Sequence, residues 1–363
     1  MALTALKNNF YDFSFIERSI IIDELIDVNV LTSIASPLSD EWIYVYTNQA
    51  DIRKINIVSG VCEIIVTFQP QRFPANATFH LYISADEKYL AITCLFQGNY
   101  ENKSICEGSI IYLQSGLEVL NLNAGDYHMQ ENPFPVCFVK HQGKNAVVHA
   151  TDWNRLDITD LETGAIITER DFGKMPEEND DAVFSEWAGI LKPSPNQERI
   201  ATIGWVWHPF GCAYSFNLKR WLAGEKWEAD SSIHRRSYVG WDGFWDASFL
   251  WIDDNRLCVW GVPDDNKYNL SENNIAIFDA ETEDELFRFS GPTKDVLFYD
   301  GFLFSGIEND AKKNVGLSIW NIENGDLLHQ EFGLNMDLYL PLSKEFVKFD
   351  EQGKISLIKW HAY

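Results

Sequence analysis

The chain has 363 residues, of which 46% are hydrophobic and 14% aromatic, a composition that excludes an intrinsically disordered protein. Its 54 acidic residues outnumber 29 basic ones, and the formal net charge of -25 disfavours nucleic acid and anionic membranes as partners. Two explanations of this charge remain open: it keeps the protein soluble, or it speeds the encounter with a basic protein.

The six cysteines are scattered without a C-x-x-C pair, so we interpret them as small buried hydrophobic residues in a reducing compartment. The first residues lack the pattern of a signal peptide, and no apolar run approaches the ~20 residues needed to cross a bilayer. We therefore expect a cytoplasmic, monomeric protein.

A strand, a tight polar turn and a strongly apolar strand recur along the chain. Polar turn residues followed by β-branched and aromatic runs suit hairpins whose second strand is buried on both faces. Each occurrence therefore predicts one blade of a β-propeller. The seven occurrences are residues 35–47, 83–93, 140–150, 192–203, 251–260, 298–306 and 341–349.

A second pattern, two alternating strands around a short turn, occurs six times, at residues 52–68, 109–123, 155–170, 213–227, 275–289 and 316–332. The missing copy is supplied if the strand at 354–360 pairs with the strand predicted at 15–25. Such pairing completes seven sheets and removes their exposed ends. We therefore predict an all-β, seven-bladed propeller of four-stranded antiparallel blades, a single domain over residues 1–363 closed by its N-terminal strand.

The turns of the second pattern are unevenly spaced, with glycines at Gly60, Gly116, Gly164, Gly224 and Gly325. The longer intervals flank residues 171–191 and 228–250, which we expect to be loops inserted between blades. Loops of this kind carry binding specificity, whereas the strands of a propeller carry stability.

Residues 318–328, SIWNIENGDLL, resemble the closing strand and turn of a WD repeat, with Trp320 at the tryptophan position and Asn321 in place of aspartate. Residues 156–166 and 275–286 resemble the same signature. The chain is thus similar to divergent WD-repeat or quinoprotein-type propellers, and the resemblance implies a non-enzymatic platform for other macromolecules. No Gly-His dipeptide opens a blade, and the buried Asp-His-Ser/Thr-Trp network of regular WD repeats is not expected.

The eight histidines show no H-x-x-x-H or H-E-x-x-H spacing, and the chain has no nucleophile elbow, phosphate loop or dinucleotide fingerprint. We expect no metal, no cofactor and no catalysis. The alternative is a propeller hydrolase or lactonase whose channel metal or carboxylates come from distant blades.

The segment 231–251 is rich in the residue types that dominate binding hot spots, tryptophan, tyrosine and arginine. We predict a contact patch of its arginine and aromatic side chains: Arg235, Arg236, Tyr238, Trp241, Phe244 and Trp245. Trp205, Trp207 and His208 end the preceding hairpin and are expected to share a rim with it. The alternative is that these aromatic side chains fill the space between two blades.

The segment 171–187 carries six carboxylates against Lys174 alone. Its Glu177, Glu178, Asp180 and Asp181 are either a solvated loop or a docking arm for a basic surface. The sequence as a whole predicts a non-enzymatic protein-binding propeller. Two versions stay open: an intracellular inhibitor or immunity-type protein that neutralises a basic toxin, and a scaffold in a larger assembly.

Overall fold

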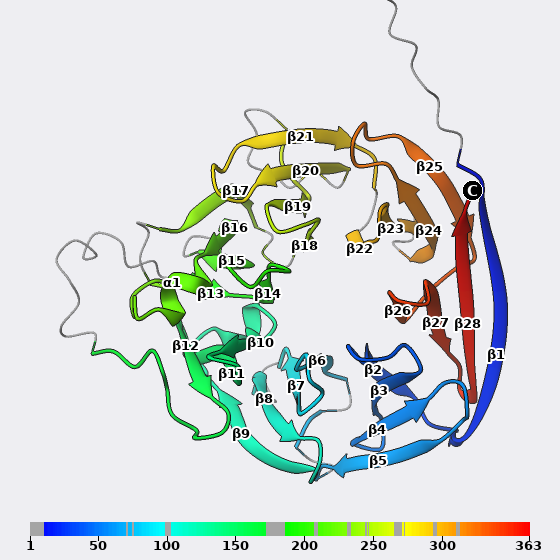
Figure 1. Cartoon of the computed structure of the whole chain (residues 1–363), viewed down its shortest axis with the longest axis horizontal. Coiled ribbons are helices and arrows are strands. Elements are labelled where there is room, and N and C mark those ends of the chain that lie inside the picture. The colour runs from blue at the N-terminus through cyan, green and yellow to red at the C-terminus, as the bar shows by residue number, and fades with distance from the viewer. Residues whose placement is uncertain are drawn as a thin grey trace, which may run out of the picture.

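The computed structural model describes residues 11–69, 72–74, 76–98, 103–171, 186–206, 210–230, 234–243, 245, 247–264, 271, 273–292, 296–309 and 313–363. Their strands form seven antiparallel sheets around a central axis, as Figure 1 shows. The predicted seven-bladed propeller is therefore confirmed. Among the described residues, no helix is long and apolar enough to cross a membrane.

The first three blades follow one another along the chain. Blade 1 contains β2 (Val30–Ala35), β3 (Trp42–Thr47), β4 (Asp51–Asn56) and β5 (Cys62–Thr67). Blade 2 contains β6 (Thr78–Ile83), β7 (Tyr89–Phe96), β8 (Ile105–Tyr112) and β9 (Leu117–Asn123). A short 3₁₀ helix, η1 (Met129–Glu131), then leads into blade 3, which contains β10 (Val136–His141), β11 (Lys144–Asp152) and β12 (Arg155–Asp160).

Blades 4 to 7 complete the circle. Blade 4 contains β13 (Glu186–Ala188), β14 (Lys192–Pro193), β15 (Ile200–Val206), β16 (Phe210–Phe216) and β17 (Arg236–Asp242), with α1 (Leu218–Leu222) before the last strand. Blade 5 contains β18 (Phe249–Trp251), β19 (Arg256–Trp260), β20 (Asn274–Asp279) and β21 (Glu285–Ser290). Blade 6 contains β22 (Val296–Tyr299), β23 (Leu303–Glu308), β24 (Asn314–Trp320) and β25 (Leu327–Phe332). Blade 7 contains β26 (Leu338–Leu340), β27 (Glu345–Phe349), β28 (Gln352–Ala362) and β1 (Phe13–Ile26).

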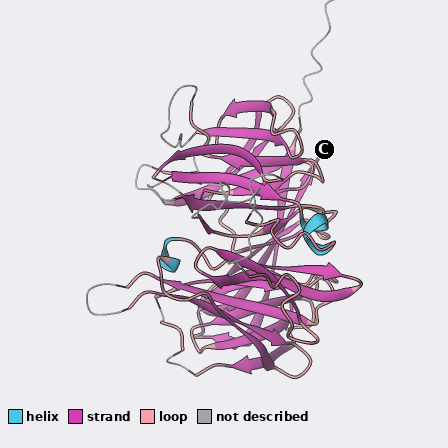
Figure 2. Cartoon of the chain, turned by 90° about the vertical axis from the view of Figure 1, so that its left-hand side faces the viewer, coloured by secondary structure: helices cyan, strands magenta, loops and turns pink. Residues whose placement is uncertain are grey.

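Because the strands of each blade alternate in direction from the axis outward, the propeller has two distinct faces. The connection face carries the links between blades and the turn between the second and third strands of each blade. The hairpin face carries the two other turns of each blade. Figure 2 shows the sheets from the side, with little helix between them.

The core lies between adjacent blades and is built mainly by their middle strands. In β3, Ile43, Tyr44, Val45 and Tyr46 are all buried although they are consecutive. Successive residues of a strand point to opposite faces of the sheet, so both faces of this strand are covered by neighbouring blades. The outer strand β5, in contrast, has no fully buried residue.

The ring closes through the two ends of the chain. Strand β1 pairs with β28 in antiparallel register from Phe13 opposite Ala362 to Ile21 opposite Lys354, and a bulge follows before Ile26. On blade 1, the buried guanidinium of Arg53 also donates a hydrogen bond to the carbonyl of Glu24 in β1. The predicted closure by the N-terminal strand is therefore confirmed, with slightly wider bounds.

Blade 4 departs from the predicted pattern. Residues 213–227 do not form two strands, because the Asn217 side chain accepts a hydrogen bond from the backbone N–H of Arg220 at 2.9 Å and caps α1. The fourth strand is β17, so the predicted loop at 228–250 is wrong for residues 236–242. The predicted loop at 171–191 is likewise wrong for β13, the start of the inner strand.

Blade 3 has three regular strands, and its fourth is reduced to one bridge between Thr159 and Ile166. A side-chain hydroxyl takes the place of a backbone carbonyl here, because Thr168 Oγ1 accepts a hydrogen bond from the backbone N–H of Ile158 at 2.9 Å. In blade 6, Trp320 donates its indole N–H to Ser305 Oγ at 3.0 Å, which is the tryptophan–serine half of the WD network. This one bond is not the complete network of four residues, so the expectation that the regular WD network does not form stays a prediction.

Candidate protein-binding surface

Six aromatic rings meet on the connection face over blades 3 and 4, and we call them the aromatic cluster. The members come from five separate segments: Tyr127, His128, Trp153, Trp187, Trp205 and Trp245. The first two precede η1, and Trp153 lies in the turn between β11 and β12. The cluster therefore forms only when consecutive blades pack.

Trp187 is the centre of the aromatic cluster and is only 2% exposed. Its ring centroid lies 4.2 Å from that of Trp205 and 4.8 Å from that of Trp153. Trp245 extends the cluster, with its centroid 5.8 Å from Trp205, and Tyr127 meets Trp153 edge-on at 5.3 Å. Tyr127 is 49% exposed, so the cluster presents part of its aromatic surface to solvent.

Backbone carbonyls hold the rings in place. The indole N–H of Trp187 donates to the carbonyl of Tyr127 at 3.0 Å, and that of Trp245 donates to the carbonyl of Glu131 at 2.8 Å. Asn132, just after η1, donates from Nδ2 to the carbonyl of Trp187 at 2.6 Å. His128 adopts a left-handed backbone conformation with φ of 54°, which turns the chain sharply into η1. The rings are thus fixed by packing and by hydrogen bonds rather than by their own loops alone.

Carboxylates flank the aromatic cluster. Asp126 and Asp152 are exposed and precede Tyr127 and Trp153 in the chain, and exposed Asp242 ends β17 next to the same face. A hydrogen bond from Lys103 Nζ at 2.8 Å holds the pKa of Asp126 below its usual range. Three exposed carboxylates therefore flank the aromatic cluster, and one of them, Asp126, is paired with exposed Lys103.

The structure divides the predicted contact patch. Trp205 and Trp245 lie together in the aromatic cluster, but Trp241 is fully buried and Tyr238 is nearly so. The Tyr238 hydroxyl lies 2.6 Å from Ser215 Oγ and donates to the carbonyl of Ala280 at 3.1 Å. The alternative interpretation, aromatic filling between blades, is correct for Tyr238 and Trp241, because they occupy inward-facing positions of β17.

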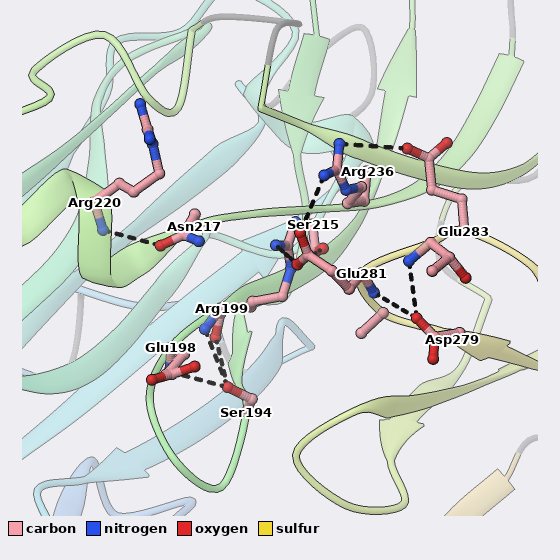
Figure 3. Close-up of polar contacts among 12 residues, drawn as sticks. Ser194, Glu198, Arg199, Ser215, Asn217, Arg220, Arg236, Asp279, Glu281 and Glu283 are labelled. Carbon is pink, nitrogen blue, oxygen red and sulfur yellow. Dashed lines mark hydrogen bonds and ion pairs between the residues drawn. The ribbon is translucent and has the colours of Figure 1, made fainter.

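The two arginines of the predicted patch have partners within the fold. Arg236 starts β17 at the hairpin face, where its guanidinium lies 3.1 Å from Glu281 and 3.8 Å from Glu283 (Figure 3). The seven residues of β17 separate Arg236 from the connection face by about 20 Å. The Arg235 guanidinium stacks 3.6 Å from the ring centroid of Tyr214. Arg236 therefore does not share a surface with Trp205 and Trp245, and a binding role of the predicted residues stays a prediction.

Seven predicted site residues lie outside the described residues: Glu177, Glu178, Asp180, Asp181, Trp207, His208 and Phe244. Conversely, sequence reasoning missed Tyr127, His128, Trp153 and Trp187 as site residues. A tryptophan in a two-residue turn, as at Trp153, was the one local signal, because a turn normally exposes its side chains. The others carry no spacing signal, since their proximity depends on blade packing.

The described residues contain no group of three or more His, Cys, Asp or Glu side chains that could hold a metal ion. His149, in blade 3, is deeply buried, and burial lowers its pKa. Its Nδ1 lies 2.9 Å from the carbonyl of Ala150, which can only accept, so Nδ1 carries the proton and Nε2 accepts from Thr159 Oγ1. Because both ring nitrogens of His149 are bonded within blade 3, we interpret this histidine as a structural residue.

No family model and no curated protein matches the chain. Solved structures match it along nearly its whole length. The structure of U3-55K aligns with a TM-score of 0.54 at 11% identity and covers 92% of this chain and 98% of that one. The β-propeller domain of Cps50 (Swd1) from Myceliophteria thermophila gives 0.56 at 9% identity, covering 91% and 96%.

A chain of the Mitotic Checkpoint Complex gives a TM-score of 0.56 at 11% identity and covers 94% of this chain and 90% of that one. Identities this low carry information on the fold alone. The resemblance that the repeat signatures indicated is borne out at this level. The chain has the fold of a seven-bladed WD-repeat-type β-propeller.

Proposed function

We propose that this chain is a non-enzymatic protein-interaction platform that binds a basic partner through the aromatic cluster. The observation that carries the proposal is the cluster itself, six rings gathered from five segments and left partly open to solvent. Trp187 belongs to the core, and Trp153 and Trp205 pack against it, whereas half-exposed Tyr127 leaves aromatic surface open to a partner. Contiguous aromatic surface with a polar rim is typical of protein-binding sites.

The charge supports a basic partner. Asp126, Asp152 and Asp242 flank the aromatic cluster, and the chain carries a net charge of -25. Complementary charge raises association rates and suppresses wrong partners. One of the similar structures is a chain of the Mitotic Checkpoint Complex, which supports a role within assemblies. We place the protein in the cytoplasm as a monomer, acting as a scaffold or as an inhibitor of a basic toxin.

The test begins with a partner captured from the native host and then purified. Trp245→Ala should weaken its binding about 30-fold or more, the loss of about 2 kcal/mol expected for a binding hot spot. The control is Trp42→Ala, which removes the same side chain from the start of β3 at the hairpin face and should leave affinity unchanged. Both variants are checked for folding by circular dichroism, and affinities are measured by calorimetry.

The charge argument is tested by association kinetics. The association rate should fall steeply between about 0.1 and 1 M salt, as the Debye length shrinks from about 10 to about 3 Å. An association rate that does not change with salt would contradict the proposal that the partner is basic. An unchanged affinity for folded Trp245→Ala would remove the aromatic cluster from it.

A further inference from the structure

The aromatic cluster limits which chemical groups of a ligand it can bind, because the indole N–H groups of two of its tryptophans already have hydrogen-bond partners. The indole N–H groups of Trp187 and Trp245 both donate to backbone carbonyls, at 3.0 and 2.8 Å. An indole has no other hydrogen-bonding group. Trp187 is 2% exposed and offers a ligand almost no surface, whereas partly buried Trp245 offers the face of its ring, which attracts cations and apolar groups.

The acceptors around the cluster are carboxylates. Asp126 and Asp152 are exposed and precede the two rings that meet edge-on, Tyr127 and Trp153. One oxygen of Asp152 already accepts the backbone N–H of Trp153 at 2.8 Å, which fixes the carboxylate beside that ring. An ionised carboxylate accepts hydrogen bonds and donates none. A planar cation with several hydrogen-bond donors would satisfy both the ring faces and the carboxylates.

We propose that the aromatic cluster recognises arginine side chains of the partner, with the guanidinium stacked on an exposed ring and hydrogen-bonded to a flanking aspartate. Guanidinium is planar, weakly hydrated and carries five N–H donors in a fixed fork, whereas the lysine ammonium is a strongly hydrated point charge. The inference rests on the proposed function and adds a side-chain specificity to it.

The experiment compares hexa-arginine with hexa-lysine, two peptides of equal charge, by isothermal titration and by quenching of tryptophan fluorescence. At about 0.15 M salt, hexa-arginine should bind about tenfold tighter, the scale of a partly desolvated cation–π contact. Tyr127→Ala and Trp245→Ala should abolish this preference. Tyr127→Phe, which keeps the ring, and Trp42→Ala on the other face should retain it. Asp152→Asn should weaken hexa-arginine binding more than hexa-lysine binding.

Equal binding of the two peptides to the unmodified protein would overturn the arginine inference and leave the platform for a basic partner standing. A preference that survives in folded Tyr127→Ala and Trp245→Ala would also overturn it, since the preference would then arise elsewhere. If neither peptide binds even at low salt, the proposal of a basic partner fails together with the inference. Thermal unfolding of each variant establishes that its fold is retained.

Discussion

Buried charges in this protein differ in how well they are compensated. Asp157, in β12, is fully buried and lies 2.6 Å from Arg155 and 2.5 Å from Arg170, and it also accepts from two threonine hydroxyls. Glu228, after α1, has one backbone donor at 2.8 Å and more distant Arg220 and His234, at 3.4 and 3.5 Å. Burial raises the pKa of Glu228 in spite of these partners.

Substitution of these two acids should therefore have opposite outcomes. Glu228→Gln keeps an acceptor for the Asn217 N–H and removes the buried charge, so the free energy of unfolding at pH 7 should stay equal or rise by about 1 kcal/mol. Asp157→Asn removes the buried carboxylate that Arg155 and Arg170 share, leaves Arg170 with Asp230, and should cost about 3 kcal/mol or more. Urea unfolding of both variants measures this difference.

The pH dependence has a definite sign for Glu228. Its pKa is higher in the folded than in the unfolded protein, so the folded state binds the proton more readily. This carboxyl therefore adds stability as the pH falls through the folded pKa toward the unfolded value of about 4.3, and the gain should be absent in Glu228→Gln. If that variant loses more than about 2 kcal/mol at pH 7, the ion pair with Arg220 and the hydrogen bonds of Glu228 outweigh the cost of its burial.

At the scale of elements, the sequence predicted hairpins well and the outer strands unevenly. All seven inner hairpins lie where the turn residues placed them, because tight turns and doubly buried strands have strong local signatures. Strand β17 was missed because its glycine and its charged ends resemble a loop, whereas in the folded blade it pairs with β16. Only two of the six members of the aromatic cluster, Trp205 and Trp245, were among the predicted site residues, because the other four come together through blade packing.

Strand β1 should be indispensable for folding. Deletion of the residues before Asp27 removes the partner of β28 and uncovers Ile355 and Leu357, which are fully buried. Loss of this much apolar burial should abolish cooperative thermal unfolding or lower the melting temperature by more than about 10 °C. The control is Ile16→Thr, which alters β1 at a position that is 59% exposed and should unfold like the unmodified protein. A deletion variant with an unchanged cooperative transition would refute the closure.

At the scale of the whole molecule, charge acts in two opposing ways. On the hairpin face, basic side chains reach acidic turn residues of the next blade, as in the pairs Lys54–Glu87, Arg199–Glu281 and Arg256–Glu323. Lys140 of blade 3 similarly reaches Asp86 of blade 2 at 2.9 Å, and the pKa of Asp86 is lowered because hydrogen bonds from Lys140, Asn145 and Ser84 outweigh its burial. These ion pairs place several of the 29 basic residues between blades. Because the chain has 54 acidic residues, it keeps a large excess of negative charge.

Salt should therefore stabilise the fold while it slows association. Partly exposed pairs between blades contribute about 0–1 kcal/mol each and lose part of that on screening, whereas a net charge of -25 repels itself throughout the molecule. We expect repulsion to dominate, so the melting temperature should rise by about 2 °C or more between about 0.01 and 0.3 M sodium chloride. Lys140→Met, which removes one pair between blades and makes the net charge more negative, should steepen this rise. A melting temperature that falls with salt in differential scanning calorimetry would mean that the pairs between blades outweigh the self-repulsion of the acidic surface.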